Sequence, residues 1–138
     1  MRVGLTHGTF DLLHVGHVRM FAQAKSMVDH FVVTLTCDSW VRKGPGRPIY
    51  NEIERAEMIA ACRHVDAVEI IYEQTGLSAI DKYKPVLYFK AKDYLHTDKH
   101  GFLEVERERV ESYGGTLFLA EHAGWSSSSI IERVRGML

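Results

Sequence analysis

The sequence predicts an α/β domain with a parallel sheet wound on both faces by helices, and three observations lead to this prediction. Short runs rich in β-branched and aromatic residues alternate along the chain with segments whose apolar residues recur at helical spacing. The alternation has the order βαβαβ, which is typical of a parallel sheet. The 138 residues, of which 46% are hydrophobic, can bury one core and leave no room for a second domain.

Five strands are expected, at residues 3–6, 31–36, 67–71, 86–90 and 116–119. Two helices follow the first two strands, with apolar stripes at Val18, Phe21 and Ala22 and at Ile53, Ala56, Ile59 and Ala60. Residues 104–111 carry mixed charges, and we interpret them as a solvated helix face without a function. The whole chain, 1–138, is therefore predicted to be one Rossmann-like domain whose ligands bind beyond the carboxyl ends of the strands.

The composition argues against several classes of protein. Lys and Arg number 17 against 18 Asp and Glu, so no basic excess favours nucleic acid or an anionic membrane. Cys37 and Cys62 form no CxxC pair, which excludes a disulfide scaffold and a cysteine zinc site and implies a reducing, cytoplasmic setting. The apolar runs are far shorter than the roughly 20 residues of a membrane span, and no signal peptide is expected.

The segment between the first strand and the first helix carries the residues best suited to chemistry. Unpaired N–H groups and a partial positive charge at a helix N-terminus favour a triphosphate. Gly8 and Gly16 allow the backbone to approach phosphate closely. His14 and His17 are three residues apart, so both rings face one side of the first turn. Two nitrogen donors facing one anion suit attack on an α-phosphate, where charge builds up on oxygen.

Two other interpretations of the histidine pair are a helix cap and a zinc site. The metalloprotease spacing is one residue longer and includes a glutamate, and no third ligand lies nearby, so no protein-bound metal is expected. A Walker P-loop is missing. The glycines Gly44 and Gly46 do not join a strand to a helix and so form no dinucleotide fingerprint.

Residues 8–17, GTFDLLHVGH, resemble the signature of the cytidylyltransferase-like nucleotidylyltransferases. The resemblance implies that the phosphate of a small-molecule acceptor attacks the α-phosphate of a nucleoside triphosphate in line and releases pyrophosphate. It assigns His14 and His17 to the phosphates and Lys43 to the reacting groups, and it leaves Mg²⁺ to be carried by the nucleotide. It also implies a homodimer.

The resemblance covers the whole chain and assigns further residues. The residues expected to bind nucleotide are Gly8, Thr9, Phe10, Gly16, Arg55, Arg63, Asp93, Gly124, Ser126, Ser127 and Ser128. The residues expected to contact the acceptor are Asp11, Asp38 and Arg47. Arginine suits phosphate because its donors form a fork, although both predicted arginines could instead pair with nearby glutamates. The serine run offers hydroxyls and free amides at the start of a last helix, which makes a second anion cradle.

The nucleotide and the acceptor are less clearly indicated, because two clues disagree. The loop 43–48, KGPGRP, and the lack of an arginine before Gly124 resemble heptose-1-phosphate adenylyltransferases. Arg63 instead resembles glycerol-3-phosphate cytidylyltransferase. ATP with a sugar phosphate is favoured over CTP with a polyol phosphate, and an FAD synthetase-like adenylyltransferase is a further alternative. A domain that binds nucleotide without turnover is the alternative from another class.

Overall fold

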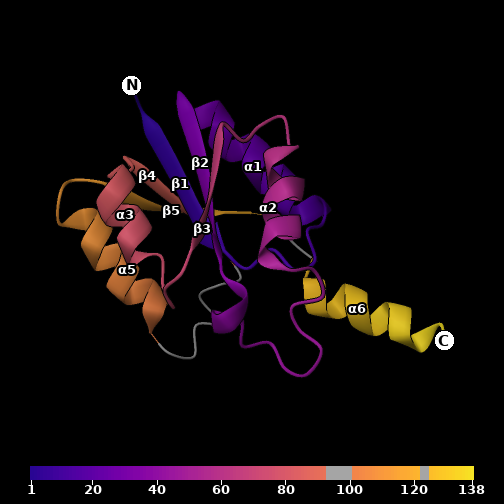
Figure 1. The fold of residues 1–138 in the computed structure, drawn as a ribbon. Coiled ribbons are helices and arrows are strands. Elements are labelled where there is room, and N and C mark those ends of the chain that lie inside the picture. Colours follow the sequence, from indigo (N-terminus) through magenta and orange to yellow (C-terminus); the bar gives the residue numbers. More distant parts are fainter. Residues whose placement is uncertain (93–100, 122–124) are drawn as a thin grey trace.

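The five strands of the protein lie side by side in one parallel sheet. The computed structural model describes residues 1–92, 101–121 and 125–138. The strand order is β3-β2-β1-β4-β5 (Figure 1). The strands are β1 (Val3–Gly8), β2 (His30–Thr36), β3 (Ala67–Ile71), β4 (Leu87–Ala91) and β5 (Thr116–Ala120). Each lies where the sequence predicts a strand, so the α/β, Rossmann-like fold is confirmed.

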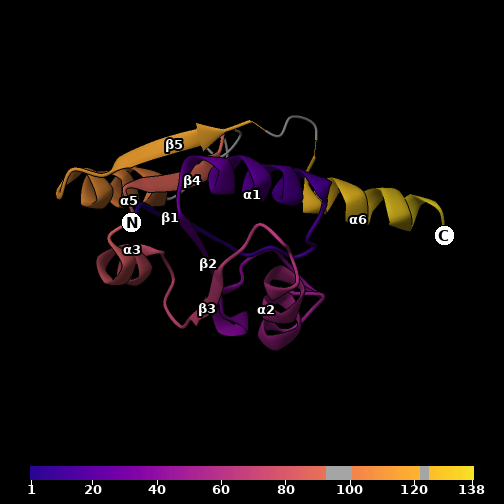
Figure 2. The same ribbon diagram turned by 90° about the horizontal axis from the view of Figure 1, so that it is seen from above.

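Helices cover both faces of this sheet (Figure 2). On one face lie α1 (Val15–Met27) and α2 (Glu52–Ala60), and on the other α3 (Leu77–Tyr83) and α5 (Phe102–Glu111). The last helix, α6 (Ser127–Gly136), begins beside α1 and projects away from the sheet (Figures 1 and 2). A short 3-10 turn, η1 (Asp38–Trp40), follows β2. Among the described helices, none has the length and apolar character needed to cross a membrane.

Two hydrophobic cores hold the layers together, one on each face of the sheet. The first packs Phe21 of α1 and Ile59 of α2 against Phe31 and its neighbours in β2. The second packs Ile80 of α3 and Val110 of α5 against the opposite face. The central strands are therefore buried on both sides, which explains the apolar runs of β2 and β4. Each fully buried large side chain contributes about 1.5–3 kcal/mol.

The strand order decides where the loops converge. The chain runs from β1 through β2 to β3 toward one edge of the sheet, and then crosses back to β4 and β5 on the other side of β1. The order therefore reverses between β1 and β4, and a doubly wound sheet binds its ligands at the carboxyl ends of the strands beside this switch point.

Candidate active site

A cavity of about 620 Å³ lies at this switch point. One wall comes from the start of α1 and the start of α6, the opposite wall from the starts of α3 and α5, and the floor from the ends of β1 and β4. The first wall includes Thr9, Phe10, His14, His17, Ser126, Ser127 and Ser128, the second Gln74, Thr75, Phe102 and Glu106, and the floor His7 and Lys90. Most of the residues predicted to bind phosphate thus share one cavity.

His14 and His17 cap the first helix and line the cavity at the same time. The backbone N–H of Gly16 donates to Nδ1 of His14 over 3.1 Å, and the backbone N–H of His14 donates to Nδ1 of His17 over 3.1 Å. The two rings stack with their centroids 3.8 Å apart. Because each Nδ1 accepts a hydrogen bond, the ring proton of the neutral imidazole is on Nε2. The cap therefore fixes the tautomer and orientation of two donors, so capping and phosphate binding are compatible roles here.

Close packing around the first loop restricts Gly8, Phe10 and Gly16. A Cβ atom at Gly16 would lie 2.9 Å from the His14 ring, and one at Gly8 would lie 3.0 Å from the Phe10 ring. Phe10 is buried, adopts a left-handed φ of 55°, and packs its ring edge-on against His17 at a centroid distance of 5.1 Å. A side chain in this backbone region stores strain of roughly 1 kcal/mol or more, which is typical of functional loops. These residues thus hold the two histidines in place.

The serine run begins α6 next to the first loop. The backbone N–H of Ser129 donates to Oγ of Ser126 over 3.0 Å, which caps the helix. The Ser127 hydroxyl donates to the carbonyl of Leu12 over 2.6 Å. Two segments more than a hundred residues apart in sequence are therefore joined, and the two helix starts meet on one cavity.

The loop after η1 places Lys43 on the cavity and buries Arg47. The carboxylate of Asp11, which is fully buried, pairs with Nε of Arg47 over 3.0 Å and accepts the backbone N–H groups of Ile49 and Tyr50. Asp11 and Arg47 thus anchor the loop to each other, and a direct contact of either with the acceptor stays a prediction. Loss of solvent around the Lys43 ammonium and, to a smaller extent, repulsion from Arg47 lower the pKa of Lys43 below its usual value. The Asp11 carboxylate opposes this shift.

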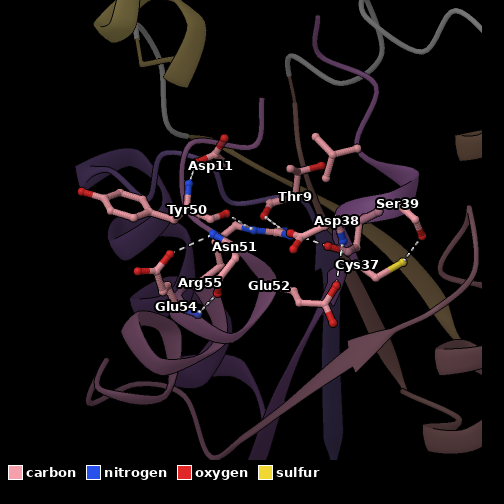
Figure 3. Close-up of polar contacts among 12 residues, drawn as sticks. Thr9, Asp11, Cys37, Asp38, Ser39, Tyr50, Asn51, Glu52, Glu54 and Arg55 are labelled. Carbon is pink, nitrogen blue, oxygen red and sulfur yellow. Dashed lines mark hydrogen bonds and ion pairs between the residues drawn. The ribbon is translucent and has the colours of Figure 1, made fainter. Parts of the chain in front are cut away.

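Arg55 joins four segments beneath the site (Figure 3). Its guanidinium donates to the carbonyls of Thr9, Thr36 and Tyr50 over 2.9, 2.7 and 3.0 Å. It also pairs with Asp38 over 2.6 Å. Arg55 is 0% exposed, and these partners occupy the guanidinium N–H donors that were expected to bind phosphate. The structure therefore gives Arg55 a bracing role, with Asp38 as its ionic partner, and shows neither of them on the cavity wall.

The remaining residues predicted to bind nucleotide are Arg63, Asp93 and Gly124. Arg63 is exposed in the turn before β3, at the amino end of that strand and thus away from the carboxyl ends that carry the cavity. Its nucleotide contact finds no support within one copy of the chain. Asp93 and Gly124 lie outside the described residues.

The floor of the cavity holds a buried polar group, His7, that no motif in the sequence indicated. His7 is 6% exposed, and its two ring nitrogens lie 3.0 Å from Oγ1 of Thr34 and 3.3 Å from Oγ1 of Thr36. Burial, helped by the Lys90 ammonium, lowers the pKa of His7 to about 3. The ring is neutral at pH 7. The signal available in the sequence was polar residues inside otherwise apolar strands, at positions next to the first loop.

The opposite wall corrects the interpretation of residues 104–111 as a solvated face without function. Arg107 and Glu104 form the expected surface pair, but Glu106 is 3% exposed and lines the cavity. Its carboxylate accepts hydrogen bonds from the hydroxyl of Tyr88 over 2.9 Å and from the backbone N–H of Gly76 over 2.8 Å. The Lys90 ammonium lies 3.8 Å from it. Alternating charges do not reveal which carboxylate faces inward, because that depends on how α5 packs.

Comparisons with known proteins identify the family of this chain. Residues 5–133 match the family model described as cytidylyltransferase-like. The chain is similar to the bifunctional protein HldE of Bradyrhizobium diazoefficiens, 39% identical over 99% of this chain, and to that of Acidiphilium cryptum, 41% identical over 97%. It spans 27% of the length of each of these relatives.

Solved structures show the same fold. A lipopolysaccharide core biosynthesis protein from Thermoplasma volcanium superposes with a TM-score of 0.71 at 24% identity, covering 91% of this chain and 99% of that one. A pantoate-beta-alanine ligase from Francisella tularensis, complexed with an ATP ligand and beta-alanine, superposes with a TM-score of 0.65 at 14% identity, covering 94% of this chain and 65% of that one.

The fold and the site together define an α/β protein with a cavity between two helix starts at the switch point of its sheet. The family match over nearly the whole chain makes the assignment specific: the chain belongs to the cytidylyltransferase-like family and is a nucleotidyltransferase.

Proposed function

We propose that this chain transfers AMP from ATP to a sugar phosphate of the heptose 1-phosphate type and releases pyrophosphate. The observation that carries the proposal is the meeting of two capped helix starts, at His14 and Ser126, on one cavity. Similarity to the HldE proteins and to a lipopolysaccharide core biosynthesis protein supports a sugar phosphate over a polyol phosphate. Arg63, the residue that pointed to CTP, lies away from the cavity.

The proposed mechanism follows from the donors on the first wall. Nε2–H groups of His14 and His17 hydrogen-bond the α- and β-phosphate oxygens, and the start of α6 holds the rest of the triphosphate. A phosphate oxygen of the acceptor attacks the α-phosphorus in line, and the bond to the bridging oxygen of pyrophosphate breaks. The histidines stabilise charge that moves onto these oxygens, and Lys43 neutralises the acceptor phosphate.

Mg²⁺ is proposed to enter with the nucleotide. Within residues 1–92, 101–121 and 125–138, no three His, Cys, Asp or Glu side chains cluster in a way that could hold a metal ion. Triphosphate oxygens supply the hard ligands that Mg²⁺ prefers, and the ion would screen their charge during attack. The residues on the first wall are nitrogen and hydroxyl donors, which suit phosphate oxygens of such a complex.

The test is a matrix of ATP and CTP against heptose 1-phosphate, glycerol 3-phosphate and FMN, with pyrophosphate release as the readout. We expect the highest kcat/KM for ATP with heptose 1-phosphate. Highest activity for CTP with glycerol 3-phosphate, or for ATP with FMN, would replace the proposal by the corresponding alternative. Nucleotide binding without pyrophosphate release from any pair would favour a binding module.

A homodimer is also proposed, on the basis of the family. Light scattering at micromolar concentration should give twice the mass of 15.7 kDa, and a monomer alone would contradict this expectation.

A further inference from the structure

The second wall of the cavity has no role in the mechanism above, although it is built around a buried charge. This wall comes from the loop before α3 and from the start of α5, and its polar residues are Gln74, Thr75 and Glu106. Burying a carboxylate requires compensation by hydrogen bonds and positive charge. Glu106 has both, because Tyr88, Gly76 and Lys90 surround it.

The compensation leaves part of the hydrogen-bonding capacity of Glu106 for a ligand. A carboxylate has about four acceptor sites. Within the part of the chain that the structure describes, Tyr88 donates to Oε1 and Gly76 donates to Oε2, and the Lys90 ammonium at 3.8 Å is beyond hydrogen-bonding distance. Roughly two acceptor sites of the carboxylate therefore remain for groups that enter the cavity.

The geometry of in-line transfer decides which substrate meets this wall, provided that the proposed function holds. The leaving pyrophosphate is held at the starts of α1 and α6, on one side of the cavity. The attacking oxygen must approach the α-phosphorus from the side opposite to the leaving group. That side is the wall formed by α3 and α5, so the acceptor enters next to Glu106.

We propose that Glu106 determines specificity for the acceptor by accepting hydrogen bonds from its hydroxyl groups. A carboxylate repels a phosphate, so the acceptor's phosphate points away from Glu106 toward the reacting groups and Lys43, which also lines the cavity. The polyhydroxylated part of the acceptor then lies against Glu106, with Gln74 and Thr75 on the same wall. The subsite thus selects a phosphorylated polyhydroxy compound over a phosphate monoester of similar size without hydroxyls.

The test compares heptose 1-phosphate with cyclohexyl phosphate, which has a ring and a phosphate but no ring hydroxyl. Dissociation constants for both compounds and for ATP are measured by calorimetry on the full chain, on Glu106→Gln and on Glu108→Gln. Glu108 is exposed on the same helix and is the matched control. We expect the parent and the control to prefer heptose 1-phosphate, and Glu106→Gln to lose about tenfold of that preference, because a hydrogen bond to a charged acceptor becomes a neutral one. ATP affinity should stay the same.

Three results would overturn the proposal: no preference in the parent, an unchanged preference in Glu106→Gln, or a loss of ATP affinity in place of acceptor affinity, which would place Glu106 against the nucleotide. If Glu106→Gln does not fold, the test uses Gln74→Ala, which changes an exposed side chain of the same wall. This variant should lower the preference for heptose 1-phosphate over cyclohexyl phosphate at least about threefold. An unchanged preference in Gln74→Ala refutes the subsite. Absence of pyrophosphate release with every acceptor contradicts the proposed function alone, whereas these binding ratios test the subsite separately.

Discussion

Replacing Arg55 by lysine separates a structural role from a phosphate-binding role. The guanidinium of Arg55 reaches carbonyls in three separate segments, at Thr9, Thr36 and Tyr50. An ammonium has a single donor atom and cannot reach all of them. If the ammonium reaches one of the three carbonyls, two buried carbonyls lose their donor, and at about 1.5 kcal/mol each the cost sums to about 3 kcal/mol. The pair with Asp38, whose side chain is 39% exposed, adds at most about 1 kcal/mol.

For a domain of this size, a loss of about 3 kcal/mol lowers Tm by roughly 10 °C. Thermal unfolding monitored by circular dichroism measures this shift, and calorimetry well below the transition measures ATP binding. Arg63→Lys, at an exposed arginine, is the matched control and should melt within about 2 °C of the parent. If Arg55→Lys melts like the control and binds ATP at least about tenfold more weakly, the bracing role is wrong and the phosphate role is restored.

Three further predictions concern the cavity itself. His14→Asn keeps an acceptor at the helix cap, so Tm should change little while kcat falls about 10²–10³-fold; near-parental turnover would contradict the catalytic role. Lys43 acts as a cation with a lowered pKa, so kcat/KM should begin to fall, as pH rises, at a pH below the usual range of lysine titration. Lys43→Arg should remove this fall, because arginine stays charged, and a pH profile identical to that of the parent would refute the role of Lys43. The pKa of His7 is lowered from 6.5 to about 3, so the unfolded state binds more protons between these values and stability decreases as pH falls. In urea unfolding, the parent should lose about 2 kcal/mol more than His7→Gln between pH 7 and pH 5, and equal losses would show that His7 is not a buried neutral base.

The fold was predictable because its signals are local and repeated. Strands buried on both faces are rich in apolar and β-branched residues, as in residues 31–36, and the intervening helices show apolar residues at a spacing of three or four. The βαβ alternation then leaves few ways to arrange the sheet.

Part of the site was also predictable, because its chemistry depends on neighbours in sequence. His14, Gly16 and His17 act within one turn of a helix, and Ser126 caps the helix that follows it. Such residues can be placed on a helix start from the sequence, and a helix start binds anions for reasons that do not depend on the rest of the fold.

The sequence by itself thus determined the layered fold and the two helix starts that meet on one cavity at the carboxyl ends of the strands. The tertiary structure alone decided whether Arg55 and Asp11 face substrate or brace the loops, and which glutamate of α5 faces the cavity. The physical reason is that a charged side chain takes its role from its partners. The partners of Arg55 and Glu106 are backbone groups up to 46 and 30 residues away, brought near only when the sheet and its helices pack together.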